Sequence, residues 1–119
     1  MKLFYIFALI KLYALIVVFD KKYLRDFYEF GRNDDKKHRF QPQVIKSYKR
    51  GIDYLKQVKD KEELFYIKSL HFEALRGEKR GLFSIRAGLQ YRIEFTIKES
   101  LDDSVLTICN IIELSNHYE

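Results

Sequence analysis

The feature that most constrains the fold is a pair of short segments, residues 82–87 and 91–98, in which apolar and polar side chains alternate. Alternation with a period of two residues is typical of strands that bury one face of a sheet. In the second segment, one face carries the apolar side chains of Tyr91, Ile93, Phe95 and Ile97. The opposite face carries Arg92, Glu94, Thr96 and Lys98. The two segments therefore predict strands that project arginine side chains from their polar face.

A basic turn flanked by glycine precedes these strands. Gly77 and Gly81 allow the chain to turn tightly around residues 76–80, because glycine adopts positive φ at little steric cost. Within residues 69–95, three acidic residues accompany five basic ones, which are Arg76, Lys79, Arg80, Arg86 and Arg92. A guanidinium group stays charged and binds phosphate through two parallel hydrogen bonds. The region therefore predicts a rigid, basic surface suited to phosphate.

Length and composition indicate one domain with its own core. The chain has 119 residues, of which 47% are hydrophobic, and a net charge of +5. The charge favours an anionic partner, although small soluble domains are often mildly basic. Because Cys109 is the one cysteine in the sequence, no disulfide can form within the chain, and a reducing cytoplasm is expected. We interpret Cys109 as a small core residue rather than a nucleophile.

The first half of the chain predicts a strand and two helices. Residues 13–19 are apolar and rich in β-branched side chains, which favours a strand that is covered or central in its sheet. A helix capped by Asp20 and ended by Gly31 should follow. Residues 32–40 form a polar, basic linker, and Pro42 is placed at the first turn of a second helix.

The second helix and the last strand complete the predicted architecture. Apolar residues recur in that helix at helical spacing and should face the sheet; they are Val44, Ile45, Tyr48, Ile52, Leu55 and Val58. Asp60 and Glu63 predict a capping box for a short helix that ends near Ile67. Residues 105–114 predict a strongly apolar strand. The result is an α+β domain of a strand, two helices and an antiparallel three-strand meander, with the helices packed on one face of the sheet.

Residues 1–14 form an apolar extension before the domain of residues 15–119. They resemble a signal peptide in charge and hydropathy, but no small-residue cleavage site follows them. They also make a poor membrane span, because Lys11 interrupts an apolar run shorter than the roughly 20 residues that a span needs. We interpret them as a mis-assigned start or an optional extension, since a leucine codon at Leu15 can serve as a bacterial start. No association with a membrane is expected.

The sequence lacks the patterns of metal and cofactor sites. The histidine and cysteine residues do not have the spacing of metal ligands, and no Walker loop or dinucleotide fingerprint is present. No cofactor is therefore expected. Cleavage of RNA without a metal has other requirements, namely a base for the 2′-hydroxyl proton, cations for the pentacovalent phosphorus and an acid for the 5′-oxygen. Arginine and lysine suit the second requirement.

Three stretches of the basic region resemble the core of the RelE/HigB-type toxins, also filed as plasmid maintenance system killer proteins of the RelE/ParE superfamily. They are residues 75–82 (LRGEKRGL), 84–86 (SIR) and 90–93 (QYRI). Residues 18–29 and 112–118 are similar to the family's opening strand and helix and to its closing strand and polar tail. The resemblance therefore extends over residues 15–119 and implies a RelE-like α+β fold.

The resemblance implies the toxin of a type II toxin–antitoxin module. Such a toxin would be an mRNA interferase that enters the ribosomal A site, cuts mRNA without a metal and inhibits translation. The implied partners are the ribosome, mRNA and a small HigA-like helix-turn-helix antitoxin, which blocks the site and alone binds DNA. A ParE-like gyrase inhibitor of the same fold is one alternative, disfavoured by the basic turn and by the terminal residues His117 and Tyr118. A non-catalytic module that binds RNA or a membrane is another.

The resemblance also implies roles for individual residues. The implied catalytic residues are Arg92, Arg76, His71, His117 and Tyr118, and the implied RNA-binding residues are Lys79, Arg80 and Arg86. Arg92 matches the strand arginine that holds the scissile phosphate; the alternative is an exposed arginine paired with Glu94 or Asp102. His71 matches a catalytic histidine of some HigB-type toxins, and a structural histidine is the alternative. Tyr91 is expected to pack in the core, and Glu113 is a second choice for the base.

Overall fold

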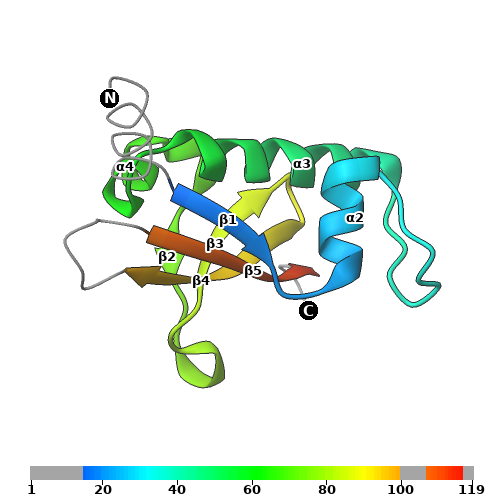
Figure 1. Cartoon of the computed structure of the whole chain (residues 1–119). Coiled ribbons are helices and arrows are strands. Elements are labelled where there is room, and N and C mark those ends of the chain that lie inside the picture. Colours follow the sequence, from blue (N-terminus) through cyan, green and yellow to red (C-terminus); the bar gives the residue numbers. More distant parts are fainter. Residues whose placement is uncertain (1–14, 100–106, 117–119) are drawn as a thin grey trace, which may run out of the picture.

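The computed structural model describes residues 15–99 and 107–116, which form a five-stranded sheet with helices packed against it (Figure 1). In chain order the elements are β1 (Leu15–Phe19), α2 (Lys22–Phe30), α3 (Pro42–Gln57), α4 (Lys61–Tyr66), the 3₁₀ turn η1 (Lys68–Leu70), β2 (Glu73–Ala74), the 3₁₀ turn η2 (Gly77–Lys79), β3 (Phe83–Ala87), β4 (Tyr91–Glu99) and β5 (Thr107–Asn116). The strand order is β1-β5-β4-β3-β2; β1 runs parallel to β5, and the other neighbours are antiparallel. The expected α+β fold and the meander of β3, β4 and β5 are confirmed. The expectation for residues 1–14 concerns a segment outside the described residues.

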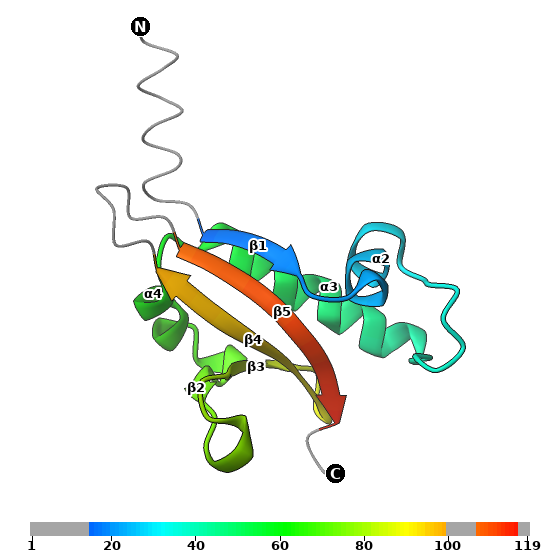
Figure 2. The same ribbon diagram turned by 60° about the horizontal axis from the view of Figure 1, so that its bottom comes forward.

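Helix α3 lies across one face of the sheet, and none of the α-helices α2, α3 and α4 lies over the opposite face (Figure 2). Tyr48 and Ile52 of α3 are fully buried and share one core cluster with Ile85 of β3 and Ile93 of β4. The Tyr48 hydroxyl also donates a hydrogen bond to the carbonyl oxygen of Leu24 at 2.7 Å, which ties α3 to α2. Because apolar side chains of β3 and β4 point to α3, their alternate polar side chains point to the uncovered face, termed the open face below.

Strand β1 lies at the edge of the sheet, so the expectation of a central or covered strand is wrong. Leu15 is 4% exposed, whereas Ile16 and Val18 are 38% and 40% exposed. Among the described residues, β1 pairs with one strand, β5, and the two strands run parallel. An apolar composition on both faces does not distinguish a strand buried on both sides from an edge strand with one uncovered face.

The start of α2 also differs from the expectation, whereas its end agrees. Lys21 rather than Asp20 is the N-cap residue, and its side chain makes no capping hydrogen bond. The backbone N–H of Asp20 instead donates to the carbonyl oxygen of Ile111 in β5 at 2.9 Å, directly after the end of β1. At the other end, Gly31 adopts a φ of 73° and donates its N–H to Phe27, as a left-handed helix end requires.

The other predicted helix signals are present in the structure. Pro42 occupies the first turn of α3. At the start of α4 the Asp60 carboxylate accepts a hydrogen bond from the Glu63 N–H at 3.0 Å, which is one half of the predicted capping box. The second half differs, because the Glu63 carboxylate accepts from the N–H of Lys59 at 2.9 Å instead of from that of Asp60.

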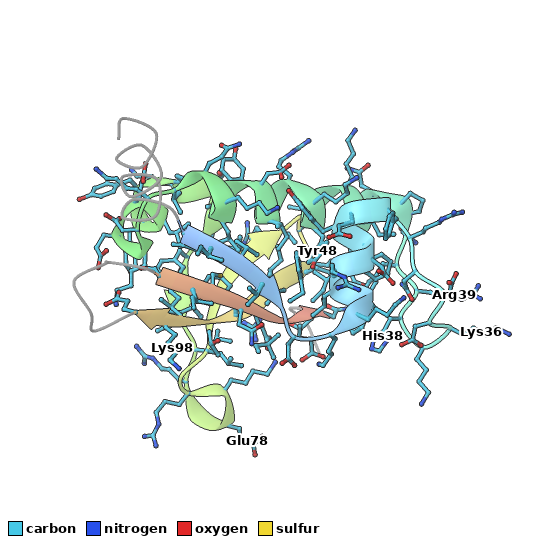
Figure 3. All side chains as sticks on the ribbon, in the orientation of Figure 1. Lys36, His38, Arg39, Tyr48, Glu78 and Lys98 are labelled. Carbon is cyan, nitrogen blue, oxygen red and sulfur yellow. The ribbon has the colours of Figure 1, made fainter. Side chains whose placement is uncertain are left out.

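The basic linker between α2 and α3 is anchored to α2 through its histidine. The His38 ring stacks on Tyr23 with ring centroids 3.7 Å apart and an interplanar angle of 7°. The Nδ1 atom of His38 lies 2.8 Å from the Asp35 carboxylate. Lys36 and Arg39 project outward at this end of the molecule (Figure 3).

Across residues 15–99 and 107–116, no helix combines the length and the apolar character that crossing a membrane demands.

Candidate functional site

The register of β3 and β4 brings polar side chains together on the open face. Arg86 lies directly opposite Arg92, and Ser84 lies directly opposite Glu94. Strand β5 adds Ser115 as the partner of Arg92 on its other side. The alternation seen in the sequence thus produces rows of charged and hydroxyl groups across three strands.

The opposition of Arg86 and Arg92 is the unusual feature of this face. Residues directly opposite each other in an antiparallel pair have Cβ atoms about 4.5–5.5 Å apart, and like charges in this position destabilise the sheet. The Arg92 side chain is 22% exposed, and Arg86 is exposed. Two guanidinium groups in this arrangement create a local positive field, which favours binding of an anion.

A cleft of about 210 Å³ includes both arginine residues. Its lining consists of His71, Glu73, Ser84, Arg86, Leu89, Tyr91 and Arg92. Three residues that the sequence singled out, His71, Arg86 and Arg92, therefore line the same cleft. Tyr91 packs against the core cluster, as expected, and it also lines the cleft; its half-buried ring lies edge-on against Phe40 with centroids 5.5 Å apart.

Glu73 is the cleft residue that the interpretation of the sequence missed. It belongs to β2, whose pairing places Glu73 opposite Ser84 of β3. A strand of two residues is too short to show the alternation that identifies a strand in a sequence. The one sequence feature that could have pointed to Glu73 as a site residue was its position two residues after His71. Glu73 is exposed, so its carboxylate is accessible to a ligand in the cleft.

His71 is held at the cleft by an uncommon backbone conformation. It ends η1 with a φ of 47° and a ψ of 50°, and its N–H donates to the carbonyl oxygen of Lys68 at 3.2 Å. Among the described residues, it is the one non-glycine residue with positive φ. Such a conformation costs about 1–3 kcal/mol, and residues that adopt it cluster at active sites and binding sites.

Glu94 binds three neighbouring side chains through one carboxylate oxygen. Its Oε2 atom accepts hydrogen bonds from Lys79 Nζ at 2.7 Å, from Arg92 Nε at 3.3 Å and from the Ser115 hydroxyl at 2.6 Å. Burial by itself would raise the pKa of Glu94, but the hydrogen bonds from Lys79 and Ser115 and the charges of Lys79 and Arg92 lower that pKa below its ordinary value. Glu94 is therefore ionised at neutral pH and is the partner of Arg92 that one interpretation of the sequence anticipated.

The basic turn has the glycine conformations that its sequence predicted. Gly77 and Gly81 adopt φ values of 67° and 98°. Lys79 reaches from this turn to the sheet, where it forms the ion pair described above. Arg76 and Arg80 are exposed and do not belong to the lining of the cleft. The structure therefore separates the predicted cations into a cleft group and a turn group, with Lys79 linking the two.

Two of the residues implied by the resemblance, His117 and Tyr118, lie outside the described residues. Strand β5 ends at Asn116, which is paired with Tyr91 of the cleft. Asp102, the other partner considered for Arg92, is also outside the described residues. The last described residue of the chain is thus paired with a residue that lines the cleft.

The part of the chain that the structure describes contains no cluster of three or more His, Cys, Asp or Glu residues able to hold a metal ion. Cys109 is fully buried, and burial raises the pKa of its thiol to about 12. A protonated thiol in the core is a poor nucleophile. This agrees with the interpretation of Cys109 as a core residue.

Comparison with known proteins connects this fold to one family. The family model described as "RelE-like toxin of type II toxin-antitoxin system HigB" matches residues 17–108. Among the matching solved structures is a YoeB/ParE toxin from Agrobacterium tumefaciens, with 15% sequence identity, a TM-score of 0.54, and coverage of 87% of this chain and 100% of that one. That likeness shows the fold. Comparison with curated protein sequences found no match. Because the family model spans most of the chain, this protein belongs to the HigB-like family of RelE-like toxins, the components that type II toxin–antitoxin systems pair with a protein antitoxin.

Proposed function

We propose that this toxin is a ribosome-dependent endoribonuclease, which cuts mRNA at the cleft and thereby inhibits translation. The observation that carries the proposal is the placement of the opposed residues Arg86 and Arg92 in one cleft with a histidine and a carboxylate. Cations, a base and an acid are the groups that cleavage of RNA without a metal requires. The cleft residues include a candidate for each role.

Arg86 and Arg92 bind the scissile phosphate. A phosphodiester carries one negative charge and presents two non-bridging oxygens, which match the parallel N–H groups of a guanidinium. The bound charge offsets the repulsion between the two arginine side chains. The same side chains stabilise the additional negative charge that develops on the pentacovalent phosphorus.

Glu73 and His71 carry out the two proton transfers. The Glu73 carboxylate accepts the proton of the 2′-hydroxyl as O2′ forms a bond to phosphorus. Protonated His71 donates a proton to the 5′-oxygen as the bond between phosphorus and that oxygen breaks. The products are a 2′,3′-cyclic phosphate and a 5′-hydroxyl. Both residues line the cleft, whereas Glu113, the second choice for the base, does not.

The remaining implied residues have supporting roles in this proposal. Arg76 and Arg80 attract RNA at longer range, because both are exposed on the basic turn. His117 and Tyr118 are the alternative candidates for these two proton transfers, as the family resemblance implies. The proposed antitoxin is a HigA-like helix-turn-helix protein that blocks the cleft, and the proposed site of action is the cytoplasm.

Primer extension on an mRNA translated in a cell-free reaction tests the proposal. The wild-type toxin should produce cuts that require translating ribosomes, and Arg92→Ala should abolish them. Lys98→Ala is the matched control, because Lys98 is an exposed cation on the same strand, paired with Ile108 and away from the cleft lining. That variant should cut as the wild type does. Intact mRNA with a wild-type toxin that still arrests growth would contradict the proposal and favour inhibition of gyrase.

A further inference from the structure

The buried carboxylate of Glu94 is the unexpected component of this basic surface. An acidic group beside a phosphate site weakens the attraction for an anion, so electrostatics alone would exclude it. The Glu94 side chain is nevertheless 1% exposed and lies next to Arg92, the arginine proposed to bind the scissile phosphate. Its burial means that Glu94 cannot itself contact RNA. Its effect on a ligand has to pass through the groups that it binds.

Two of those groups are cations that come from different elements of the fold. Lys79 comes from η2 and Arg92 from β4, and their Nζ and Nε atoms lie 2.7 Å and 3.3 Å from the same oxygen of Glu94. The hydroxyl of Ser115 on β5 is bound to that oxygen at 2.6 Å. One atom therefore sets the positions of an ammonium group and a guanidinium group relative to each other.

Both cations remain accessible although their common partner is buried. The side chains of Lys79 and Arg92 are 42% and 22% exposed, compared with 1% for Glu94. Together with Arg86 they bring three positive charges against the two carboxylates of Glu94 and Glu73, so the local charge stays positive. An anion that binds Arg92 thus meets Lys79 at a fixed separation.

The basic turn depends on this contact for its position over the sheet. The hydrogen bond from the Leu75 N–H to the Leu82 carbonyl oxygen, 2.8 Å long, closes the base of the turn. Beyond that bond, the ion pair with Glu94 is the side-chain contact that the described residues show between η2 and the strands. Loss of the carboxylate would leave Lys79 without its anchor.

We infer that Glu94 is a positioning residue, which holds Lys79 and Arg92 side by side so that both cations bind the same phosphate group. Its role in catalysis rests on the proposed RNA cleavage. Glu94 keeps Arg92 oriented along β4, and it converts Lys79 from a mobile surface cation into part of the phosphate site. The charge of Glu94 weakens the attraction for the RNA, but it also fixes the positions of the two cations. Positioning has the larger effect on the rate of a chemical step.

Glu94→Gln separates positioning from simple electrostatics. The substitution keeps the size of the side chain but removes the charge that holds both cations. We expect the single-turnover rate of mRNA cleavage on ribosomes to fall about 100-fold, while the toxin concentration at half-maximal rate changes little. A purely electrostatic role predicts the opposite result, because removal of a negative charge should strengthen RNA binding. A rate equal to or above that of the wild type would overturn the inference.

Lys79→Met tests the same pair from its more accessible side, because Lys79 is 42% exposed on a surface turn, and its thermal unfolding is measured beside its cleavage rate. It should lower the rate by a similar factor, and the double variant with Glu94→Gln should be no slower than Glu94→Gln alone, since both changes remove the same arrangement. Lys98→Met is the matched control on the same sheet face and should leave the rate unchanged. Additive losses, or full activity of Lys79→Met, would contradict the inference.

Inorganic phosphate tests the site without any cleavage. In NMR titrations of the full chain, the signals of Arg92 Nε–H and Lys79 Nζ should shift with one shared dissociation constant. In Glu94→Gln the Arg92 Nε–H and Lys79 signals should report different constants. Independent responses in the wild type would overturn the inference. If both signals report one dissociation constant but the protein does not cut mRNA, the proposed function is refuted, whereas the inference that Glu94 holds the two cations at one phosphate site remains supported.

Discussion

Arg86 and Arg92 face each other across strands β3 and β4, on the side of the sheet that α3 leaves uncovered. An opposite-charge pair at this position would stabilise the sheet, whereas two guanidinium groups destabilise it. Proteins accept a loss of this kind where binding or catalysis needs the groups involved. We therefore expect this pair to lower the stability of the sheet and to support the activity of the toxin.

Replacing Arg86 with alanine should remove most mRNA cleavage and leave the free energy of unfolding unchanged or higher by up to about 1 kcal/mol, because the like-charge pair disappears. Urea denaturation and primer extension measure the two quantities. Arg86→Lys is the control, since it keeps the charge but loses the planar donor pair, and it should cut at an intermediate rate. Reduced stability together with full cleavage would show that Arg86 has a structural role.

Glu73→Gln should lower the rate of cleavage by about 10²–10⁴-fold, the usual contribution of a general base, without loss of mRNA binding. Its stability should match that of the wild type, because Glu73 is exposed. Glu78→Gln removes the same charge from the neighbouring turn η2, where the side chain points away from the sheet (Figure 3), and should cut normally. Equal cleavage rates for the two variants would show that Glu73 takes no part in the reaction.

The lowered pKa of Glu94 predicts how stability changes with pH. Because the folded-state pKa lies below the ordinary value of 4.5, the ionised network stabilises the protein above that value and loses its contribution as the pH falls through the lowered pKa. The free energy of unfolding should therefore be lower for Glu94→Gln than for the wild type at pH 7. Urea titrations between pH 7 and pH 3 should show this difference shrinking toward acid. A difference that stays constant would mean that the charge of Glu94 is not what stabilises the fold.

The close contact between α3 and β4 predicts the effect of a methyl group at Gly51. A Cβ atom there would lie 2.6 Å from Cδ1 of Ile93, which is closer than side-chain atoms pack. Gly51→Ala should therefore destabilise the protein by about 1–3 kcal/mol, despite the higher helix propensity of alanine. Thermal unfolding measures this change, and cleavage should also fall, because Ile93 lies between Arg92 and Glu94. The double variant Gly51→Ala/Ile93→Val lacks the clashing atom and should recover stability; no recovery would place the strain elsewhere.

Local patterns were sufficient for much of this fold. The alternation of residues 91–98 identified both faces of β4, because a strand places successive side chains on opposite sides. Gly77 and Gly81 marked the tight turn, because their φ values of 67° and 98° suit glycine. The arginine at position 92 and the histidine at position 71 were also recognised, through the family resemblance of the segments around them.

What the sequence by itself determined were the helices, most of the strands, the basic turn and the polar face, since each depends on residues close together in the chain. Only the tertiary structure decided that β1 lies at the edge, that Glu73 enters the cleft through the two-residue strand β2, and that Glu94 is buried. In its buried position Glu94 is hydrogen-bonded to Lys79 and Ser115, which stand 15 and 21 residues away along the chain. Alternation assigns a residue to a face of the sheet, but the groups that cover that face come from elsewhere in the chain. Which groups cover the face depends on strand order and turn geometry, and no short segment of the sequence encodes these.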